Sequence, residues 1–121
     1  IDLTNLPPSM YILDVAMDKP TLKGDLEGSF DLRQLPPKIA MIAAQQNNLS
    51  GELHLNGLPR TLIFLLLDKN NFSGSLVLNN LPTAMRKLSL SNNAFTGSLD
   101  LTHFPVGFEE LLLFGNQLSG E

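Results

Sequence analysis

The chain has 121 residues, of which 43% are hydrophobic and 17% charged, the composition of one ordinary folded domain. Its net charge is −4 and its eight lysines and arginines are scattered, so we expect no nucleic-acid binding through phosphate contacts. The absence of cysteine excludes disulfides and a thiol nucleophile. The apolar runs are far shorter than the roughly 20 residues that cross a bilayer, so we expect no membrane insertion.

One pattern recurs along the chain at a fixed spacing. Leu62, Leu65, Leu67, Asn70 and Phe72 fall at offsets of 0, 3, 5, 8 and 10. This is L-x-x-L-x-L-x-x-N-x-L, with a period of 23 residues that lies in the range of repeat solenoids. The other regular copies begin at Ile39, Met85 and Phe108.

The first copy of the pattern is irregular. Met10, Leu13 and Val15 keep the strand positions, but Asp18 stands where the other copies have asparagine. Six extra residues lie within 19–25, and we expect them to form a protruding surface loop. An insertion on a repeat often lies on the binding face. Degenerate sequence near the end of an array explains it equally well.

Each copy predicts one short strand of a parallel sheet. Leu65 and Leu67 are two residues apart, so they point to one face of a strand while Leu66 points to the other. Because one strand cannot bury its apolar row alone, the copies stack and form a continuous core. The predicted strands are Tyr11 to Val15, Met41 to Ala44, Phe64 to Leu67, Lys87 to Leu90 and Glu110 to Leu113.

An asparagine follows each regular strand, where the chain must turn away from the sheet. Its side-chain amide has both donors and an acceptor, so it can satisfy backbone groups that the turn leaves open. We therefore expect a ladder of stacked asparagines. Its members are Asn47, Asn70, Asn93 and Asn116.

The second half of each copy should form the other side of the coil. Alternation at Leu76 and Leu78 predicts a short extended piece, which Pro82 ends. We expect short strand, turn or 3₁₀ structure there and little α-helix. The glycines at 51, 74 and 97 mark an unusual backbone angle or a close approach of neighbouring coils. The predicted single domain, residues 1–121, divides into coils at 1–29, 30–52, 53–75, 76–98 and 99–121.

The whole chain resembles the leucine-rich repeat superfamily. Its 23-residue period, with S-G-x-L-x-L-x-x-L-P in the second half, is similar to repeats of trypanosomatid proteins, some of them surface antigens, and more loosely to plant-type repeats. The resemblance implies a right-handed superhelix with the parallel sheet on its concave face and short extended or 3₁₀ segments on its convex face. It also implies binding of other macromolecules, through positions that the repeat pattern leaves free.

No motif for catalysis or for a cofactor occurs in the sequence. His54 and His103 have no carboxylate or cysteine set around them. Glu109 and Glu110 are adjacent, so on a strand they face opposite ways and cannot act as a paired acid and base. We expect a non-enzymatic protein with no catalytic residue, no cofactor and no metal site.

Two N-x-[ST] sequons are candidate glycosylation sites. They begin at Asn48 and Asn71, each beside an asparagine of the ladder, and would suit a glycosylated surface protein. The repeat itself places x-[LF]-[ST]-G at this position, and the later copies have Ala94 and Gln117 there. Chance filling of the position is the simpler explanation.

The outward positions of the predicted sheet are the candidate partner-binding site. They predict one exposed apolar strip on the N-terminal copies and another on the last copy, and such clusters mark interaction surfaces. We expect a protein or peptide ligand. The alternatives are packing against further repeats or a second copy, and a structural spacer or stalk within a larger surface protein. The predicted partner-binding residues on this concave face are Ile12, Met41, Phe64, Leu66, Asp68, Lys87, Leu112 and Phe114.

Both ends fall within the repeat pattern. Leu111, Leu113 and Leu118 belong to a full-strength copy that no polar cap follows, and Ile1 opens in mid-repeat. An uncapped solenoid end exposes its core rows and an unpaired strand edge. We therefore expect either a fragment of a longer array or a protomer that forms a homo-oligomer through its C-terminal edge.

Overall fold

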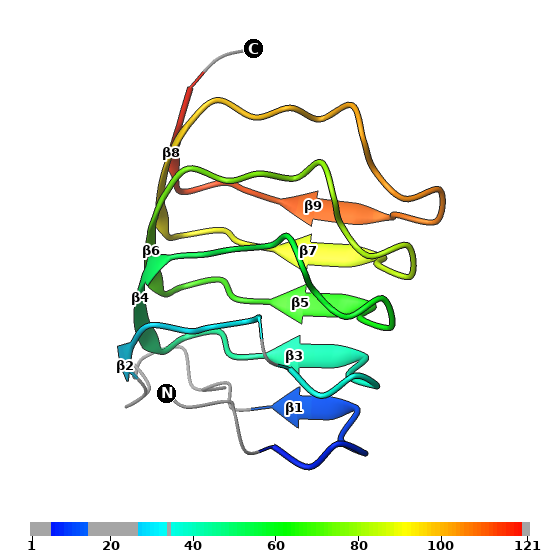
Figure 1. Cartoon of the computed structure of the whole chain (residues 1–121). Helices are drawn as coiled ribbons and strands as arrows, with labels where there is room; N and C mark the ends of the chain where they lie inside the picture. Colours follow the sequence, from blue (N-terminus) through cyan, green and yellow to red (C-terminus); the bar gives the residue numbers. More distant parts are fainter. Residues whose placement is uncertain (1–5, 15–26, 34, 120–121) are drawn as a thin grey trace.

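The structure, a computed structural model, describes residues 6–14, 27–33 and 35–119. These residues form two parallel sheets of five strands each. The chain passes through the two sheets alternately, so that each winding adds one strand to each sheet (Figure 1). This parallel-strand solenoid confirms the fold that the repeat predicts. No helix occurs within the described residues, so none there is long and apolar enough to cross a membrane.

The first sheet, here called the leucine sheet, carries the strands predicted from the repeat. Its central row, Ile42, Leu65, Leu88 and Leu111, is aligned across neighbouring strands with the 23-residue register of the sequence. The last four predicted strands extend one residue further, and the hydrogen bonds continue there too, since Leu67 N donates to Ser89 O at 2.9 Å. The first predicted strand begins one residue earlier than the observed one, and its final residue, 15, lies outside the described residues. The strands, in spatial order, are β1 (Ile12–Asp14), β3 (Met41–Ala43), β5 (Phe64–Leu66), β7 (Lys87–Ser89) and β9 (Glu110–Leu112).

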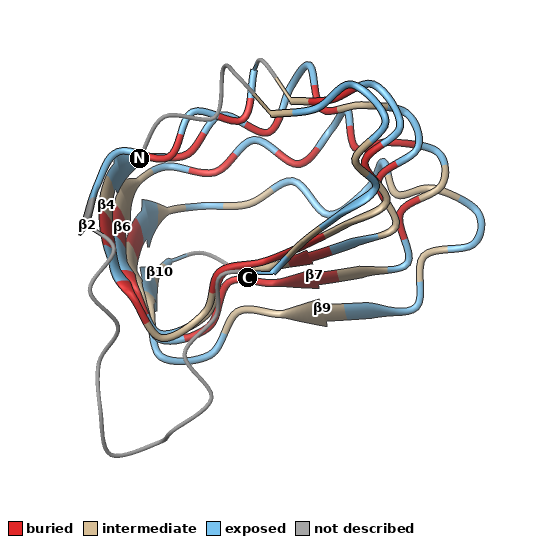
Figure 2. Ribbon diagram, turned by 90° about the horizontal axis from the view of Figure 1, so that it is seen from below, coloured by how far each residue is buried: buried red, intermediate tan, exposed pale blue. Residues whose placement is uncertain are grey.

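The second sheet, here called the glycine sheet, lies on another side of the coil (Figure 2). We predicted the extended piece of the second half later in each copy, near Leu76 and Leu78; those two residues are buried but form no strand. The paired segments lie earlier and include the glycines; Gly51, Gly74 and Gly97 have φ between 83° and 88°. The strands, in chain order, are β2 (Glu27–Gly28), β4 (Asn48–Glu52), β6 (Asn71–Gly74), β8 (Ala94–Gly97) and β10 (Gln117–Leu118).

The core fills the space between the sheets with leucines and a row of phenylalanines. The rings of Phe72 and Phe95 stack with centroids 6.3 Å apart, and Phe30 lies against Phe72 at 6.4 Å. Leu65, Leu88 and their row neighbours in the central repeats are fully buried. In the last repeat the corresponding leucines are only partly buried, as the tan and pale blue ribbon of β9 shows (Figure 2).

A proline turn returns the chain to the leucine sheet in every repeat. Pro59 O accepts a hydrogen bond from Leu62 N at 3.1 Å, and Pro82 O accepts one from Met85 N at 3.0 Å. Proline takes part in this turn only as an acceptor through its carbonyl, so its lack of an N–H costs no hydrogen bond. The same turn follows Pro7, Pro36 and Pro105.

Some predictions lie outside the described residues. They are the insertion at 19–25, the aspartate at 18 and the opening of the chain at residue 1. The right-handed coil, the concavity of the leucine sheet and the division into coils stay predictions.

Candidate functional site

The outer face of the leucine sheet is the face that points away from the core, and three rows of side chains cover it. A row is made of residues at the same position in successive repeats, aligned by the strand register. The first row is Ile12, Met41, Phe64, Lys87 and Glu110; the second is Asp14, Ala43, Leu66, Ser89 and Leu112; the third is Gln45, Asp68, Ser91 and Phe114.

Apolar side chains of the outer face remain accessible to solvent. Phe114 is 65% exposed, Ile12 51% and Phe64 37%. Met41, Leu66 and Leu112 are half-buried. Folding leaves a large part of these side chains in contact with water, so apolar surface is available for burial against a partner.

Charged residues at the C-terminal side of this face form pairs. Lys87 Nζ lies 3.1 Å from Glu110 Oε1, and both belong to the first row. Arg86 Nη1 lies 3.2 Å from Glu109 Oε1, on the residues just before those strands. Because both pairs are largely exposed, each contributes at most about 1 kcal/mol to stability. Lys87, a predicted partner-binding residue, is thus already engaged by a neighbouring repeat.

The polar members of the third row, Gln45, Asp68 and Ser91, are at least partly buried, which the sequence did not indicate. Ser89 of the second row donates through Oγ to Asp68 Oδ1 at 3.2 Å. Ser91 is only 1% exposed although it points away from the core. Gln45 Oε1 and Ser91 Oγ are buried without a hydrogen-bond partner among the described residues.

The stacked asparagines lie at the end of the leucine sheet, and Asn70, Asn93 and Asn116 each join two repeats. Asn70 Nδ2 donates to Leu67 O of its own repeat and to Ala44 O of the preceding one, both at 3.0 Å. Its Oδ1 accepts from Leu49 N at 3.1 Å. Asn93 and Asn116 repeat this arrangement with the equivalent atoms. Asn47 donates to Ala44 O at 3.2 Å.

The residue before each of these asparagines has a left-handed backbone, a feature that sequence reasoning missed. Gln46, Lys69 and Asn92 have φ of 60°, 59° and 58°, and Gly115 has φ of 73°. The signal was present only at Asn92 and Gly115, which are residue types that tolerate this region. The turn that these residues make carries the chain from the leucine sheet towards the glycine sheet.

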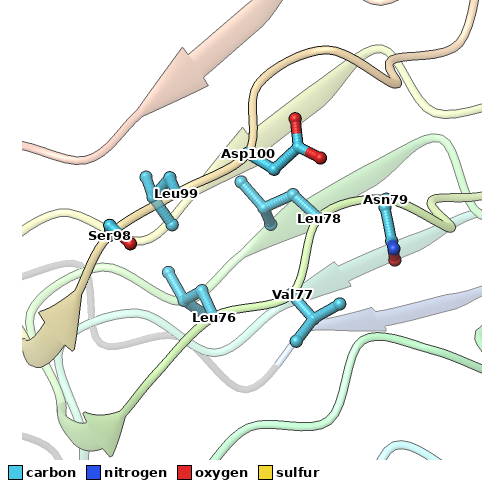
Figure 3. A pocket seen from close by; sticks show the side chains of 7 residues that line it. All are labelled: Leu76, Val77, Leu78, Asn79, Ser98, Leu99 and Asp100. Carbon is cyan, nitrogen blue, oxygen red and sulfur yellow. The ribbon is translucent and has the colours of Figure 1, made fainter. Parts of the chain in front are cut away.

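A hollow of about 280 Å³ lies between the connecting segments of two neighbouring repeats (Figure 3). It was not predicted from the sequence. Val77 beside it is 57% exposed and Leu101, just past it, is 50% exposed. Its lining residues are Leu76, Val77, Leu78, Asn79, Ser98, Leu99 and Asp100.

Two aspartates on the connecting segments have lowered pKa values. The Arg33 side chain donates to Asp31 through Nε at 2.9 Å and Nη2 at 3.2 Å, and this bonding lowers the pKa of Asp31. The Thr102 hydroxyl donates to Asp100 and is the main cause that lowers the pKa of that carboxyl. His103 Nδ1 lies 3.7 Å from Asp100 Oδ2. All these groups are exposed, and they form no enclosed site.

The sequon asparagines, Asn48 and Asn71, begin β4 and β6 of the glycine sheet and are exposed. They therefore lie away from the outer face of the leucine sheet. Within residues 6–14, 27–33 and 35–119, no group of three or more His, Cys, Asp or Glu side chains is placed to hold a metal ion.

Comparison with models of protein families finds no match, and comparison with curated proteins also finds none. Among solved structures, the chain is similar to a plant peptide hormone receptor, RGFR1, in complex with RGF2. The TM-score is 0.75 and the sequence identity 25%. The match covers 95% of this chain and 19% of the receptor chain, so the chain spans about a fifth of that receptor's length.

Proposed function

The chain has the leucine-rich repeat fold, and we propose that it is a non-enzymatic module that binds a protein or peptide on the outer face of its leucine sheet. The observation that carries the proposal is the exposure of Ile12, Phe64 and Phe114 on that face. Binding a partner would bury this surface and release its water, which is the main favourable term in most protein association.

The similar receptor supports a peptide or protein as the ligand. That protein is a plant peptide hormone receptor, described in complex with RGF2. Parallel sheets of stacked repeats offer an extended surface to such ligands. We infer the same class of ligand here, without carrying over the hormone itself. The trypanosomatid and surface-antigen resemblance finds no support in this comparison and stays a prediction.

A binding face also explains why the outer rows mix apolar and charged residues, while the core rows contain only apolar ones. The first row runs from Ile12 through Phe64 to Glu110, whereas every equivalent core position is apolar. A spacer between domains needs no apolar side chain on this face, and polar residues there would serve it equally well. The exposed aromatic rings therefore favour binding over the spacer.

The experiment is a selection of short random displayed peptides on the immobilised chain, followed by affinity measurements on variants. The test variant is Phe64→Asp combined with Leu66→Asp, which places charge in the apolar part of the face. The matched control is Val77→Asp combined with Leu101→Asp, which makes the same change on the exposed connecting segments. Circular dichroism checks that both variants remain folded.

We expect the test variant to weaken binding by roughly tenfold or more, since central apolar anchors dominate interface energies. The control variant should bind as the unchanged chain does. Loss of binding in the control alone would show that peptides bind at the hollow lined by Val77 and not on the leucine sheet. Selection of no peptide, together with no protein partner captured from an extract, would favour the spacer.

A further inference from the structure

The third row of the outer face combines a carboxylate, an aromatic ring and two buried oxygens without a hydrogen-bond partner among the described residues. The order Gln45, Asp68, Ser91, Phe114 follows from the backbone. Gln46 N donates to Asp68 O at 3.0 Å, Lys69 N to Ser91 O at 2.9 Å and Asn92 N to Phe114 O at 2.8 Å. The four residues therefore lie side by side on consecutive repeats, about 4.8 Å apart from strand to strand.

Asp68 is positioned by a neighbour and has no basic partner. Ser89 Oγ donates to its Oδ1 at 3.2 Å and draws the carboxylate towards the adjacent repeat. The described residues form ion pairs elsewhere, and none of those pairs joins Asp68 to a lysine, arginine or histidine. Asp68 is half-buried, so part of the residue remains open to a ligand.

Two further oxygens of the row have no hydrogen-bond partner. Gln45 Oε1 and Ser91 Oγ are buried and unpaired within the described part of the chain. Such atoms are rare in folded proteins. Because both are buried, a ligand would meet the row at the charged, half-buried Asp68 between them.

Phe114 adds an aromatic ring to the same row. Ser91, between Asp68 and Phe114, is small and only 1% exposed, so it adds almost no accessible surface between them. Asp68 and Phe114 lie two repeats apart, roughly 10 Å from strand to strand. The ring itself is 65% exposed and can accept a stacked group.

We propose, resting on the peptide-binding function inferred above, that Asp68 and Phe114 hold an arginine side chain of the bound peptide. A guanidinium group carries five N–H donors and no acceptor, and its plane can pair with a carboxylate and stack on an aromatic ring together. The neighbouring apolar side chains, Leu66 and Leu112, would take apolar residues beside that arginine. The ligand class is thus an extended peptide with an arginine flanked by apolar residues.

The test uses the arginine-containing peptides from the display selection as probes. Each peptide is synthesised with arginine and with citrulline, which has nearly the same shape but no charge. Both forms are titrated against the unchanged chain and against Asp68→Asn, which keeps an acceptor for Ser89. Asp100→Asn is the matched control, since it removes the same charge from the connecting segment near the hollow.

We expect the selected peptides to be enriched in arginine and the citrulline form to bind roughly tenfold or more weakly, as charged hydrogen bonds of this kind require. In Asp68→Asn the two forms should bind alike, while Asp100→Asn should preserve the difference. Peptides that depend on Phe64 and Leu66 but show no arginine preference would overturn this inference and leave the proposed function intact. A selection that yields no peptide for the face would overturn both.

Discussion

The side chain of Asn70 donates a hydrogen bond from Nδ2 to the backbone oxygen of Ala44, 26 residues earlier, at 3.0 Å. The same nitrogen donates to Leu67 O at 3.0 Å, and Oδ1 accepts from Leu49 N at 3.1 Å. One buried side chain therefore satisfies backbone groups of two repeats. This clamp repeats along the stack and holds the outer face of the leucine sheet in register.

Replacing Asn70 by alanine should strongly destabilise the protein. The change leaves Ala44 O and Leu49 N without this partner in a buried setting, and we expect a loss of roughly 2–4 kcal/mol in the free energy of unfolding. Asn71→Ala is the matched control, because Asn71 is exposed and should change stability by no more than about 0.5 kcal/mol. Urea denaturation measures both. Equal losses of unfolding free energy in the two variants would show that the Asn70 hydrogen bonds do not stabilise the stack.

Replacing Leu88 by alanine should remove buried packing from the centre of the core. Leu88 is fully buried between the leucine and glycine sheets, so we expect a loss of about 2–5 kcal/mol in unfolding free energy. Leu101→Ala, at a half-exposed site, should cost no more than about 0.5 kcal/mol. Thermal unfolding followed by circular dichroism compares them. A Leu88 variant as stable as the Leu101 variant would contradict the assigned core.

Replacing Lys69 by glycine should stabilise the protein. Lys69 has φ of 59°, where a side chain with a Cβ atom is strained by about 1–2 kcal/mol and glycine is not. Glycine also gives the unfolded chain more freedom, so we expect a net gain of about 0.5–1 kcal/mol.

The control for this variant is Lys38→Gly, at an exposed lysine outside the set with positive φ. It should lower stability by up to about 1 kcal/mol, because only the unfolded-state effect acts there. Urea midpoints of the two variants should therefore move in opposite directions. Movement in the same direction would mean that the left-handed turn at Lys69 is not strained.

The carboxyl of Asp31 should titrate below the ordinary range of an aspartate. The main cause is the hydrogen bond from the Arg33 side chain, which favours the charged form and lowers the pKa. Because the unfolded chain then binds this proton more tightly, the stability that Asp31 adds is complete above the unfolded pKa and is lost as pH falls through the folded pKa.

An NMR titration of the side-chain carboxyl carbons measures this pKa directly. In Arg33→Ala the pKa of Asp31 should rise towards its ordinary value. The pKa of Asp100 should stay lowered, because Thr102 is its main cause. An Asp31 pKa that does not respond to loss of Arg33 would refute the assigned hydrogen bond.

The sequence predicted the leucine sheet closely because the pattern of apolar side chains along each strand identifies it. Leu65 and Leu67 alternate with Leu66, and the same alternation returns after 23 residues, so both the strand and its register can be read. The glycine sheet could not be read in this way. Its three central strands each bury one large side chain, Leu49, Phe72 or Phe95, and they are held together by backbone pairing. One buried apolar residue per strand gives no alternating pattern in the sequence.

The candidate site shows the same division. That Phe64 and Phe114 point away from the core follows from period two. Two other features depend on how side chains of different repeats pack together. Ser91 is buried, and Asp68 accepts a hydrogen bond from Ser89 and forms none of the ion pairs of the described residues. Such contacts join residues more than twenty positions apart, so local sequence patterns cannot indicate them.

The most direct test of the binding function is a chemical-shift map of a selected peptide on the isotope-labelled chain. We expect the backbone amides of the outer face to change most, at residues 64, 66, 68, 112 and 114. Residues 76–79 and 98–100 around the hollow should stay unchanged. Changes confined to the hollow, or spread over the glycine sheet, would contradict a binding site on the leucine sheet.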